Sequence, residues 1–486
     1  MNYGYLAVFI GYLVVVLGVG VWGFTRETYD GYVVAERNVG LPLSVGSFFA
    51  TYISSATVVG FVGYTTLNGA AIFPTYFWGF ALGWVTLTLV AARMRGLGLR
   101  TVPSLFEVRH KSPGLRAFSA AVIVVAFVFS VMTQLVAGSI VLHVVVGIPQ
   151  VTALVLLAVV LTIYTVMGGL VAVIRTDFLQ GGLILLGVLS AFAVLLATVG
   201  SDVFHVEADR TGLFQGSIAS TTDVVAFLLI AWGGVAAQPY YLHRFFAARN
   251  ASTARQMIGV GALLATIVYL AIVFIGMALP GLLPADQLGD SAIVYFGLSQ
   301  GGLLGSLLLV GIVCAVQSTV DSALHLAGVY TTEDILVRVR PAMTERTRLV
   351  LARSVTAVLG ALCTAGAVYF VVSGGEFIVT LLNIWLGTLS SALLVPLYGS
   401  LLWRRATPRG AASSSVGGFL GYFVTLAAAE YGGVEAPGHP IFYGFGISLV
   451  AMVAVSLVTT PVSDPEVHRR FFGGGGGAGL GEVASR

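Results

Sequence analysis

The sequence predicts an all-α membrane protein with thirteen transmembrane helices. Three observations support this class: 57% of the 486 residues are hydrophobic, only 9% are charged, and apolar stretches long enough to cross a bilayer recur along the whole chain. A soluble globular protein carries about 25% charged residues. The composition therefore excludes a soluble enzyme, a nucleic-acid-binding protein, a secreted disulfide scaffold and a disordered chain, and it makes the lipid bilayer the expected surroundings.

The thirteen apolar stretches are predicted to be helices, because a transmembrane barrel would show short alternating segments of about 10 residues instead. No cleavable signal peptide is expected, since nothing basic precedes the first apolar run. The predicted spans are 4–24, 45–67, 71–92, 117–146, 150–168, 171–199, 224–247, 256–281, 293–329, 350–373, 376–403, 411–429 and 440–460.

The basic residues predict the orientation of these spans. Arg26 and Arg37 follow the first span, which favours a cytoplasmic first loop and an N-terminus outside the plasma membrane. With thirteen spans, Arg210 is the only one of the 24 Lys and Arg residues on a predicted outer loop. The C-terminus is then cytoplasmic, and residues 461–486, with five glycines from Gly473 to Gly477, are expected to form a flexible tail.

Two predicted spans contain residues that can interrupt a helix. The second span carries the polar residues Thr51, Ser54 and Ser55 near its middle, and such a segment can unwind where it lines a cavity. The seventh span, 224–247, contains two glycines and a proline from Trp232 to Pro239, and Gln238 precedes the proline. Close helix packing by small residues, and a simple proline kink, are the alternatives for these two spans.

The ninth span has a polar face. Ala315, Ser318, Thr319 and Ser322 follow the spacing i, i+3, i+4 and i+7, so they share one side of a helix. Two hydroxyls and a carbonyl on one face suit a hard cation, which prefers oxygen ligands. Hydroxyls that bond back to their own helix are the alternative interpretation.

Two carboxylates are predicted within or at the edge of the membrane. Asp177 begins the sixth span, and Asp321 lies in the ninth span, one turn from Ser318 and one turn from His325. Because a charge in hydrocarbon is costly, such residues usually serve ion binding or proton transfer. A structural cap between Arg175 and Asp177 is the alternative for the first of them.

Four stretches of the sequence resemble the sodium:solute symporter family, which includes sodium-coupled carriers of proline, pantothenate, monocarboxylates and sugars. The stretches are DGYVVAERNVG at Asp30–Gly40, GGLVAVIRTDFLQ at Gly168–Gln180, the Gln238-Pro239 pair with Arg244-Phe245, and AVQST at Ala315–Thr319 leading to Glu333-Asp334. They occur in the family's order over most of the chain. Tyr52 departs from the aspartate of the proline-carrier branch.

The resemblance implies a LeuT-type fold of two inverted five-helix repeats. We expect a leading helix at 1–24, the first repeat at 45–199, the second at 224–403 and two peripheral helices at 411–460. The family's main sodium site corresponds to carbonyls at the break of the second span and to oxygens of the ninth, and the matching residues are Ala50, Ile53, Ala315, Ser318 and Thr319. A second ion site, known in some members, corresponds to Asp177, Asp321 and Ser322.

The resemblance also implies a solute site between the breaks of the second and seventh spans. The candidate contacts are Thr51, Ser54, Ser55, Gln134, Trp232 and Gln238. An anionic solute would suit the positive ends of half-helices, so a monocarboxylate or a pantothenate-like acid is the first hypothesis, with an amino acid or a sugar as alternatives.

The expected function is secondary active transport: symport of a small organic solute with sodium, without any cofactor other than the coupling ion and without a nucleic-acid partner. A proton-coupled carrier of the same fold is the alternative that Asp321 and His325 suggest. A channel is less favoured because no repeated filter motif is found. An enzyme is not expected because the seven His and two Cys form no nucleophile–base or metal cluster in the sequence.

Overall fold

The computed structural model describes residues 10–12, 14–16, 18–19, 28–200, 220–375, 378–431 and 438–473. In these ranges every regular element is a helix, and one isolated parallel bridge joins Val39 to Ala248. The helices of the first half are α2 (Tyr29–Val34), α3 (Leu41–Tyr52), η2 (Ala56–Phe61), α4 (Val62–Asn68), α5 (Ile72–Gly96), α6 (Ser104–His110), α7 (Pro113–Val146), α8 (Gln150–Met167) and α9 (Leu170–Val199).

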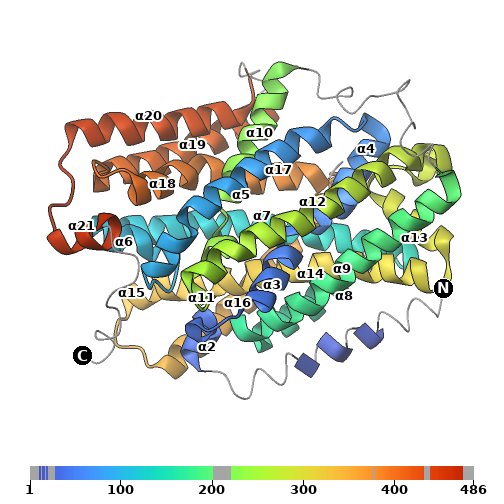
Figure 1. The fold of residues 1–486 in the computed structure, drawn as a ribbon, viewed down its shortest axis with the longest axis horizontal. Helices are drawn as coiled ribbons and strands as arrows, with labels where there is room; N and C mark the ends of the chain where they lie inside the picture. The colour runs from blue at the N-terminus through green and yellow to red at the C-terminus, as the bar shows by residue number, and fades with distance from the viewer. Residues whose placement is uncertain are drawn as a thin grey trace.

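The second half continues the helical bundle (Figure 1). Its helices are α10 (Thr221–Ala236), α11 (Pro239–Ala247), α12 (Ala251–Leu282), η4 (Ala285–Gln287), η5 (Gly289–Ser291), α13 (Ala292–Gln300), α14 (Gly302–Tyr330), η6 (Thr331–Leu336), α15 (Val337–Val339), α16 (Glu345–Val372), α17 (Ile378–Leu389), η7 (Ser390–Leu394), α18 (Val395–Leu402), α19 (Pro408–Tyr431), α20 (Pro440–Val458) and α21 (Pro465–Phe472).

Eleven helices of the described chain are long and apolar enough to cross a membrane, and the pair Leu41–Tyr52 and Ala56–Asn68, bent by 44°, makes a twelfth span. These spans confirm the predicted all-helical membrane class and correspond to the second to thirteenth stretches of the sequence. Most of the predicted first span, 4–24, lies outside the described residues. Within it, the hydroxyl of Tyr12 donates to Gln317 on α14 at 2.7 Å and accepts from Gln180 on α9 at 2.9 Å.

The predicted ninth span, 293–329, is wrong as a single helix. The structure divides it into α13 and α14, and Gly301 between them has a φ of +67°. A residue with a side chain adopts this left-handed region only at a cost, so the glycine allows the chain to turn between the two helices. Only α14 has the length and composition of a membrane span.

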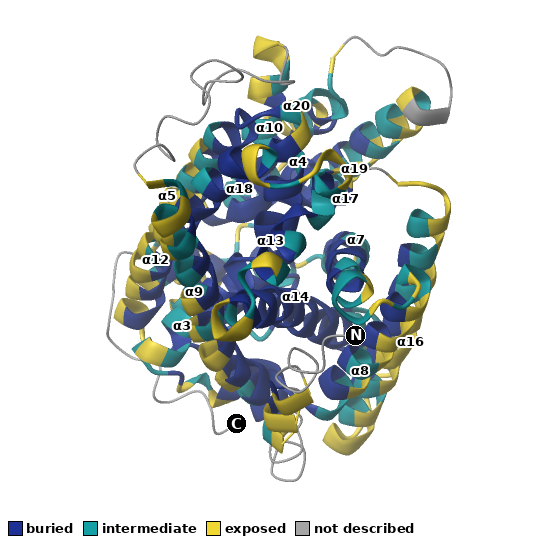
Figure 2. Cartoon of the chain, turned by 90° about the vertical axis from the view of Figure 1, so that its right-hand side faces the viewer, coloured by how far each residue is buried: buried dark blue, intermediate teal, exposed yellow. Residues whose placement is uncertain are grey.

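Helix α14 lies at the centre of the bundle and α16 at its edge (Figure 2). Of the most apolar part of α14, 83% is buried, against 22% for α16. Exposed Val358, Leu362 and Tyr369 show that the outer face of α16 is apolar. An apolar outer face is what a helix in contact with lipid requires, whereas the polar residues of α14 are enclosed by α3, α7, α9 and α16.

Two glycines bring α3 and α9 into close contact. A Cβ added to Gly46 would lie 2.6 Å from Cδ2 of Phe178, and one added to Gly181 would lie 3.2 Å from the carbonyl oxygen of Gly46. Small residues of this kind let helix backbones approach in membranes. The contact brings Asp177 of α9 within reach of α3.

The C-terminal segment differs from the flexible tail expected for 461–486. Residues 465–472 form α21, whose Val467 and Phe471 are one turn apart and buried. The guanidinium of Arg109 on α6 lies 5.8 Å from the ring centre of Phe471, and Lys111 pairs with Asp464. This amphipathic helix has an apolar side to bury, which the polar and glycine-rich composition of the tail concealed. Residues 474–486 lie outside the described part.

The connection between α12 and α14 holds a carboxyl group whose pKa is raised. Oδ2 of Asp290 accepts a hydrogen bond from the backbone N–H of Ile378, at the start of α17, at 3.0 Å. Its Oδ1 is buried and has no hydrogen-bond partner in the described ranges, and α4 approaches so closely that a Cβ on Gly63 would lie 2.5 Å from this oxygen. Burial raises the pKa of Asp290 to about 7, and the Ile378 N–H opposes the shift.

We expect this carboxyl group to make stability depend on pH. Between about pH 4 and pH 7 the folded protein holds a proton that the unfolded chain has released, so stability falls as the pH rises through this window and levels off above it. Thermal unfolding of the detergent-solubilised protein should show a midpoint that falls by a few degrees over this range. Asp290→Asn should make this decline less steep, and Asp286→Asn, at an exposed position of the same connection, should leave it unchanged.

Candidate functional site

The helical backbone is interrupted after Tyr52, inside the second span. Ile53 has a φ of −80° and a ψ of 90°, and the chain resumes as the π-helical segment η2. The backbone N–H of Ser55, which would have bonded within a regular helix, donates at 3.1 Å to Oε1 of Gln134 on α7. The Ser55 hydroxyl donates to the same oxygen at 2.5 Å. Gln134 thus satisfies a donor that the break would otherwise leave unpaired in the membrane.

The carbonyls freed by the break face the polar side of α14. The hydroxyl of Ser318 donates to the carbonyl oxygen of Ala50 at 2.8 Å, and that of Thr319 lies 3.5 Å from the carbonyl of Thr51. The Ala315 carbonyl lies 3.4 Å from the Ser318 hydroxyl and 3.2 Å from that of Thr319. All five residues are fully buried. A cluster of uncharged oxygens of this kind is suited to a small hard cation.

The structure thus brings together four of the five residues predicted for the main sodium site: Ala50, Ala315, Ser318 and Thr319. The fifth, Ile53, lies at the break itself, but no hydrogen bond joins it to α14. Thr319 instead reaches the carbonyl of Thr51, two residues before Ile53.

Asp177, predicted for a second ion site, is buried in an ion pair with Arg244 of α11. Its Oδ2 lies 2.8 Å from Nη2 of Arg244 and accepts from the hydroxyl of Ser47 at 2.6 Å. Ser322 of α14 accepts from the same nitrogen at 2.9 Å. In the sequence, Arg244 stood out only as part of a motif, and Arg175 was the candidate partner of Asp177. Sequence distance concealed the pair, since the two residues are 67 positions apart.

Asp321, the other residue predicted for the second ion site, points elsewhere. Its Oδ1 accepts a hydrogen bond from Thr165 on α8 at 2.9 Å, and its Oδ2 has no hydrogen-bond partner among the described residues. His325 does not pair with Asp321. Its Nε2 lies 3.0 Å from the carbonyl oxygen of Tyr32, to which it can only donate, and its ring packs edge-on against Tyr32.

The predicted solute contacts are only partly brought together. Ser54, Ser55 and Gln134 lie buried at the break of α3. Gln238 lies buried at the interruption between α10 and α11, and its Oε1 has no partner in the part of the chain that the structure describes. The hydroxyl of Thr51 is taken up by Arg244 at 2.5 Å. Trp232 is half-buried away from these residues, where its indole N–H donates to Thr86 of α5 and its ring packs against Phe445 of α20.

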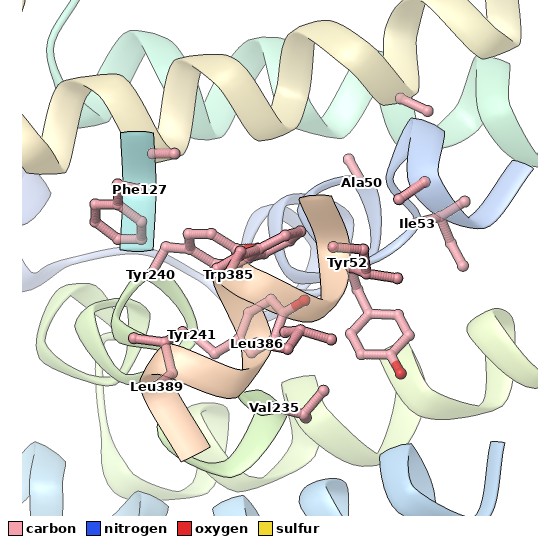
Figure 3. Close-up of a cluster of buried hydrophobic side chains, with 14 of the residues drawn as sticks. Ala50, Tyr52, Ile53, Phe127, Val235, Tyr240, Tyr241, Trp385, Leu386 and Leu389 are labelled. Carbon is pink, nitrogen blue, oxygen red and sulfur yellow. The ribbon is translucent and has the colours of Figure 1, made fainter. Parts of the chain in front are cut away.

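A group of buried aromatic side chains between the two interruptions was missed by the sequence analysis (Figure 3). Tyr240 stacks on Phe127, with 5.6 Å between the ring centres. The centre of the Tyr240 ring also lies 4.8 Å from that of Tyr241 and 6.3 Å from that of Trp385. Tyr241 lies 5.7 Å from Tyr52. We call these five residues the aromatic group. The two tyrosines directly after Pro239 were the available signal, but nothing in the sequence indicates that α7 and α17 meet them.

The aromatic group carries polar atoms without partners. The hydroxyls of Tyr52 and Tyr240 and the indole N–H of Trp385 are buried and make no hydrogen bond within the described chain, and the same is true of Nε2 of Gln134. All four can donate a hydrogen bond. Buried donors are usually satisfied, so each of these atoms is a candidate contact for a ligand with acceptor groups.

Solved structures of known transporters have the same architecture. A substrate-bound, outward-open sodium-coupled sialic acid symporter matches with a TM-score of 0.78 and 23% identity, over 94% of this chain and 98% of that one. A nucleobase-cation-symport-1 family transporter in a closed conformation matches with a TM-score of 0.59 and 15% identity, over 90% and 97%. The chain therefore has the LeuT-type fold of membrane-spanning helices.

Comparison with known protein sequences identifies the family to which the chain belongs. The chain is 25% identical to the sodium/pantothenate symporter of Escherichia coli K12, over 94% of this chain and 97% of the relative, and 25% identical to a sodium/proline symporter of Staphylococcus aureus NCTC 8325, over 92% and 91%. The model of the sodium:solute symporter family matches residues 32–418. The chain belongs to the sodium:solute symporter family, whose members carry a small solute together with sodium.

Proposed function

We propose that this symporter binds its coupling sodium ion between the break of α3 and the hydroxyl face of α14, and moves a small organic solute with it by alternating access. The supporting observation is the buried cluster of oxygens from Ala50, Ala315, Ser318 and Thr319. A sodium ion would be bound by these oxygens with the hydroxyl protons turned away, and the Ile53 carbonyl would complete the site. Both helices must keep their relative position for the ion to bind, which would couple binding to the transport cycle.

Ser318→Ala with Thr319→Ala tests the sodium site. Removing two ligands should weaken sodium binding and so raise the half-saturating sodium concentration for uptake into proteoliposomes by at least about ten-fold. A loss of about 1.4 kcal/mol of binding free energy has this effect. Ser306→Ala is the matched control, because its hydroxyl donates to the carbonyl of Gly302 on the same helix and not to α3. An unchanged sodium dependence in the double variant would show that sodium binds elsewhere.

The solute is proposed to be a small organic acid, either a monocarboxylate or a pantothenate-like acid. The aromatic group offers apolar surface, and its unpartnered atoms are mostly donors, which suits a carboxylate or carbonyl on an apolar body. The positive end of α11, which begins at Pro239, favours a negative group in the same region. Two sodium/pantothenate symporters are among the relatives, at 25% and 24% identity.

A thermal-shift screen of organic acids, amino acids and sugars, with and without sodium, tests the solute class. A ligand that binds the folded protein raises its apparent stability by mass action. We expect hits among organic acids, larger in sodium than in potassium. Tyr240→Phe removes one donor while keeping the ring, so it should weaken such a hit. Hits confined to amino acids or sugars would contradict the acid hypothesis.

A proton-coupled carrier is the second candidate, and Asp321 is the observation that favours it. A buried carboxyl with one unpartnered oxygen and no ion pair within the described residues is the kind of group that can carry a proton across a membrane. The sodium-coupled function nevertheless has the better support, since the oxygen cluster and the family both favour sodium.

We therefore expect a pH gradient in sodium-free buffer to drive no uptake, and Asp321→Asn to retain sodium-driven uptake. Thr165→Val, which removes the hydrogen bond to Asp321, serves as the companion variant. Uptake driven by protons alone and lost in Asp321→Asn would favour the proton-coupled carrier instead.

The proposal includes a plasma-membrane location with the N-terminus outside and the C-terminus in the cytoplasm, on the distribution of basic residues. It also includes the division into two inverted repeats at 45–199 and 224–403. The broken span of α3 and α4 and the interrupted span of α10 and α11 would then hold equivalent positions in the two repeats.

A further inference from the structure

Helix α21 has an apolar side that the protein covers and a basic side that it leaves at the surface. Val467 and Phe471 are buried, whereas Arg469 and Arg470 are exposed. Helix α6 lies beside α21 at one end of the bundle (Figure 1). The guanidinium of Arg470 donates to the carbonyl of Leu97, where α5 ends. The helix is therefore docked on the ends of the membrane helices through one side only.

Helix α21 lies close to the boundary between the apolar spans and water. The span α20 ends at Val458, and six residues connect it to Pro465, the first residue of α21. Six extended residues cover at most about 20 Å. Leu457 and Val458 are 57% and 83% exposed, and Leu402 at the end of α18 is 51% exposed. Exposed apolar residues at the end of a span face lipid, so α21 is placed near the level of the lipid headgroups.

The turn between the spans α18 and α19 adds three exposed arginines next to α21. Arg404 and Arg405 follow the end of α18, and Arg409 lies in the first turn of α19. The guanidinium of Arg404 lies 5.7 Å from the ring centre of Phe472 on α21. Nη2 of Arg405 donates at 3.0 Å to the carbonyl of Leu457, at the end of α20. These contacts join the turn to α21 and α20 in one surface.

Positive charge dominates this surface. We call six exposed residues the basic patch, namely Lys111, Arg404, Arg405, Arg409, Arg469 and Arg470. In the segments that carry them, 104–112, 403–409 and 459–473, the acidic residues are Glu107, Asp464 and Glu466. Glu107 already pairs with Arg116 and Arg338, and Asp464 pairs with Lys111 at 3.3 Å. With Asp464 and Glu466 subtracted, the patch keeps four positive charges, which is more than the net charge of +3 of the whole chain.

We propose that the basic patch binds the headgroups of anionic phospholipids. The position favours this partner, because the patch is continuous with the lipid-facing residues Leu402, Leu457 and Val458. The charge favours it as well, since each Lys or Arg near an anionic membrane surface contributes about 1 kcal/mol of attraction. Guanidinium groups also bind phosphate through two parallel hydrogen bonds. Binding there would hold α21 against the ends of α5, α18 and α20.

The binding can be measured as stabilisation, without knowing the transported solute. Dioctanoyl-phosphatidylglycerol, added to the purified full-length protein in uncharged detergent, should raise the thermal unfolding midpoint by a few degrees, because a ligand of the folded protein stabilises it by mass action. Dioctanoyl-phosphatidylcholine, which has no net charge, and inorganic phosphate should not. The shift should shrink when potassium chloride is raised from about 0.05 M to about 0.5 M, since salt screens exposed charges.

Three outcomes of this measurement would overturn the proposal. These are no shift with phosphatidylglycerol, an equal shift with phosphatidylcholine, and an equal shift with inorganic phosphate. The last of them would mean that a free anion is sufficient and that the lipid is not the partner.

Variants test whether the basic patch is responsible. Arg404→Gln, Arg409→Gln and Arg469→Gln together remove half of its basic residues and should remove about half of the shift. Arg340→Gln with Arg346→Gln is the matched control, at exposed positions of the connection between α15 and α16, and should keep the full shift. A full shift in the triple variant, or an equal loss in the control, would contradict binding at the patch. If the triple variant does not fold, the comparison of the two lipids on the unchanged protein decides.

Discussion

The interruption of the second span after Tyr52 is the constraint on which the functional core depends. A broken helix within a membrane frees carbonyl and N–H groups that lipid cannot satisfy. Here the partners come from other helices: Gln134 of α7 accepts from Ser55, and Ser318 and Thr319 of α14 reach the carbonyls of Ala50 and Thr51. The same contacts that make the break tolerable therefore assemble the oxygen cluster proposed for sodium.

The ion pair of Arg244 and Asp177 is a second consequence of this arrangement. A buried ion pair costs desolvation, and it is maintained only where further hydrogen bonds satisfy its remaining atoms. Ser47, Thr51, Ser322 and the Tyr240 carbonyl provide these bonds. The pair joins α11 to α3, α9 and α14, so the interrupted seventh span is tied directly to the helices of the sodium site.

Much of the fold could be predicted from the sequence because hydrocarbon imposes strong and simple rules. Length and apolar composition identified the spans from α3 to α20, and the i, i+3, i+4 spacing on α14 identified the face that meets α3. The division of the ninth span at Gly301 was missed because both α13 and α14 are apolar, and composition does not show where a helix turns. Helix α21 was missed because it is only eight residues long, is mostly polar in composition and is followed by a glycine run.

The sequence by itself determined the class of protein, the positions of the membrane helices and the oxygen-bearing residues of the break and of α14, because burial in hydrocarbon and helix periodicity act locally along the chain. Only the tertiary structure decided which polar groups meet. Arg244 reaches Asp177 across 67 positions, Trp232 bonds to Thr86 of α5, and Tyr52, Tyr240 and Trp385 come from three helices. The reason is physical: pairing of buried polar atoms depends on how helices pack against one another, and spacing along the chain carries no record of that packing.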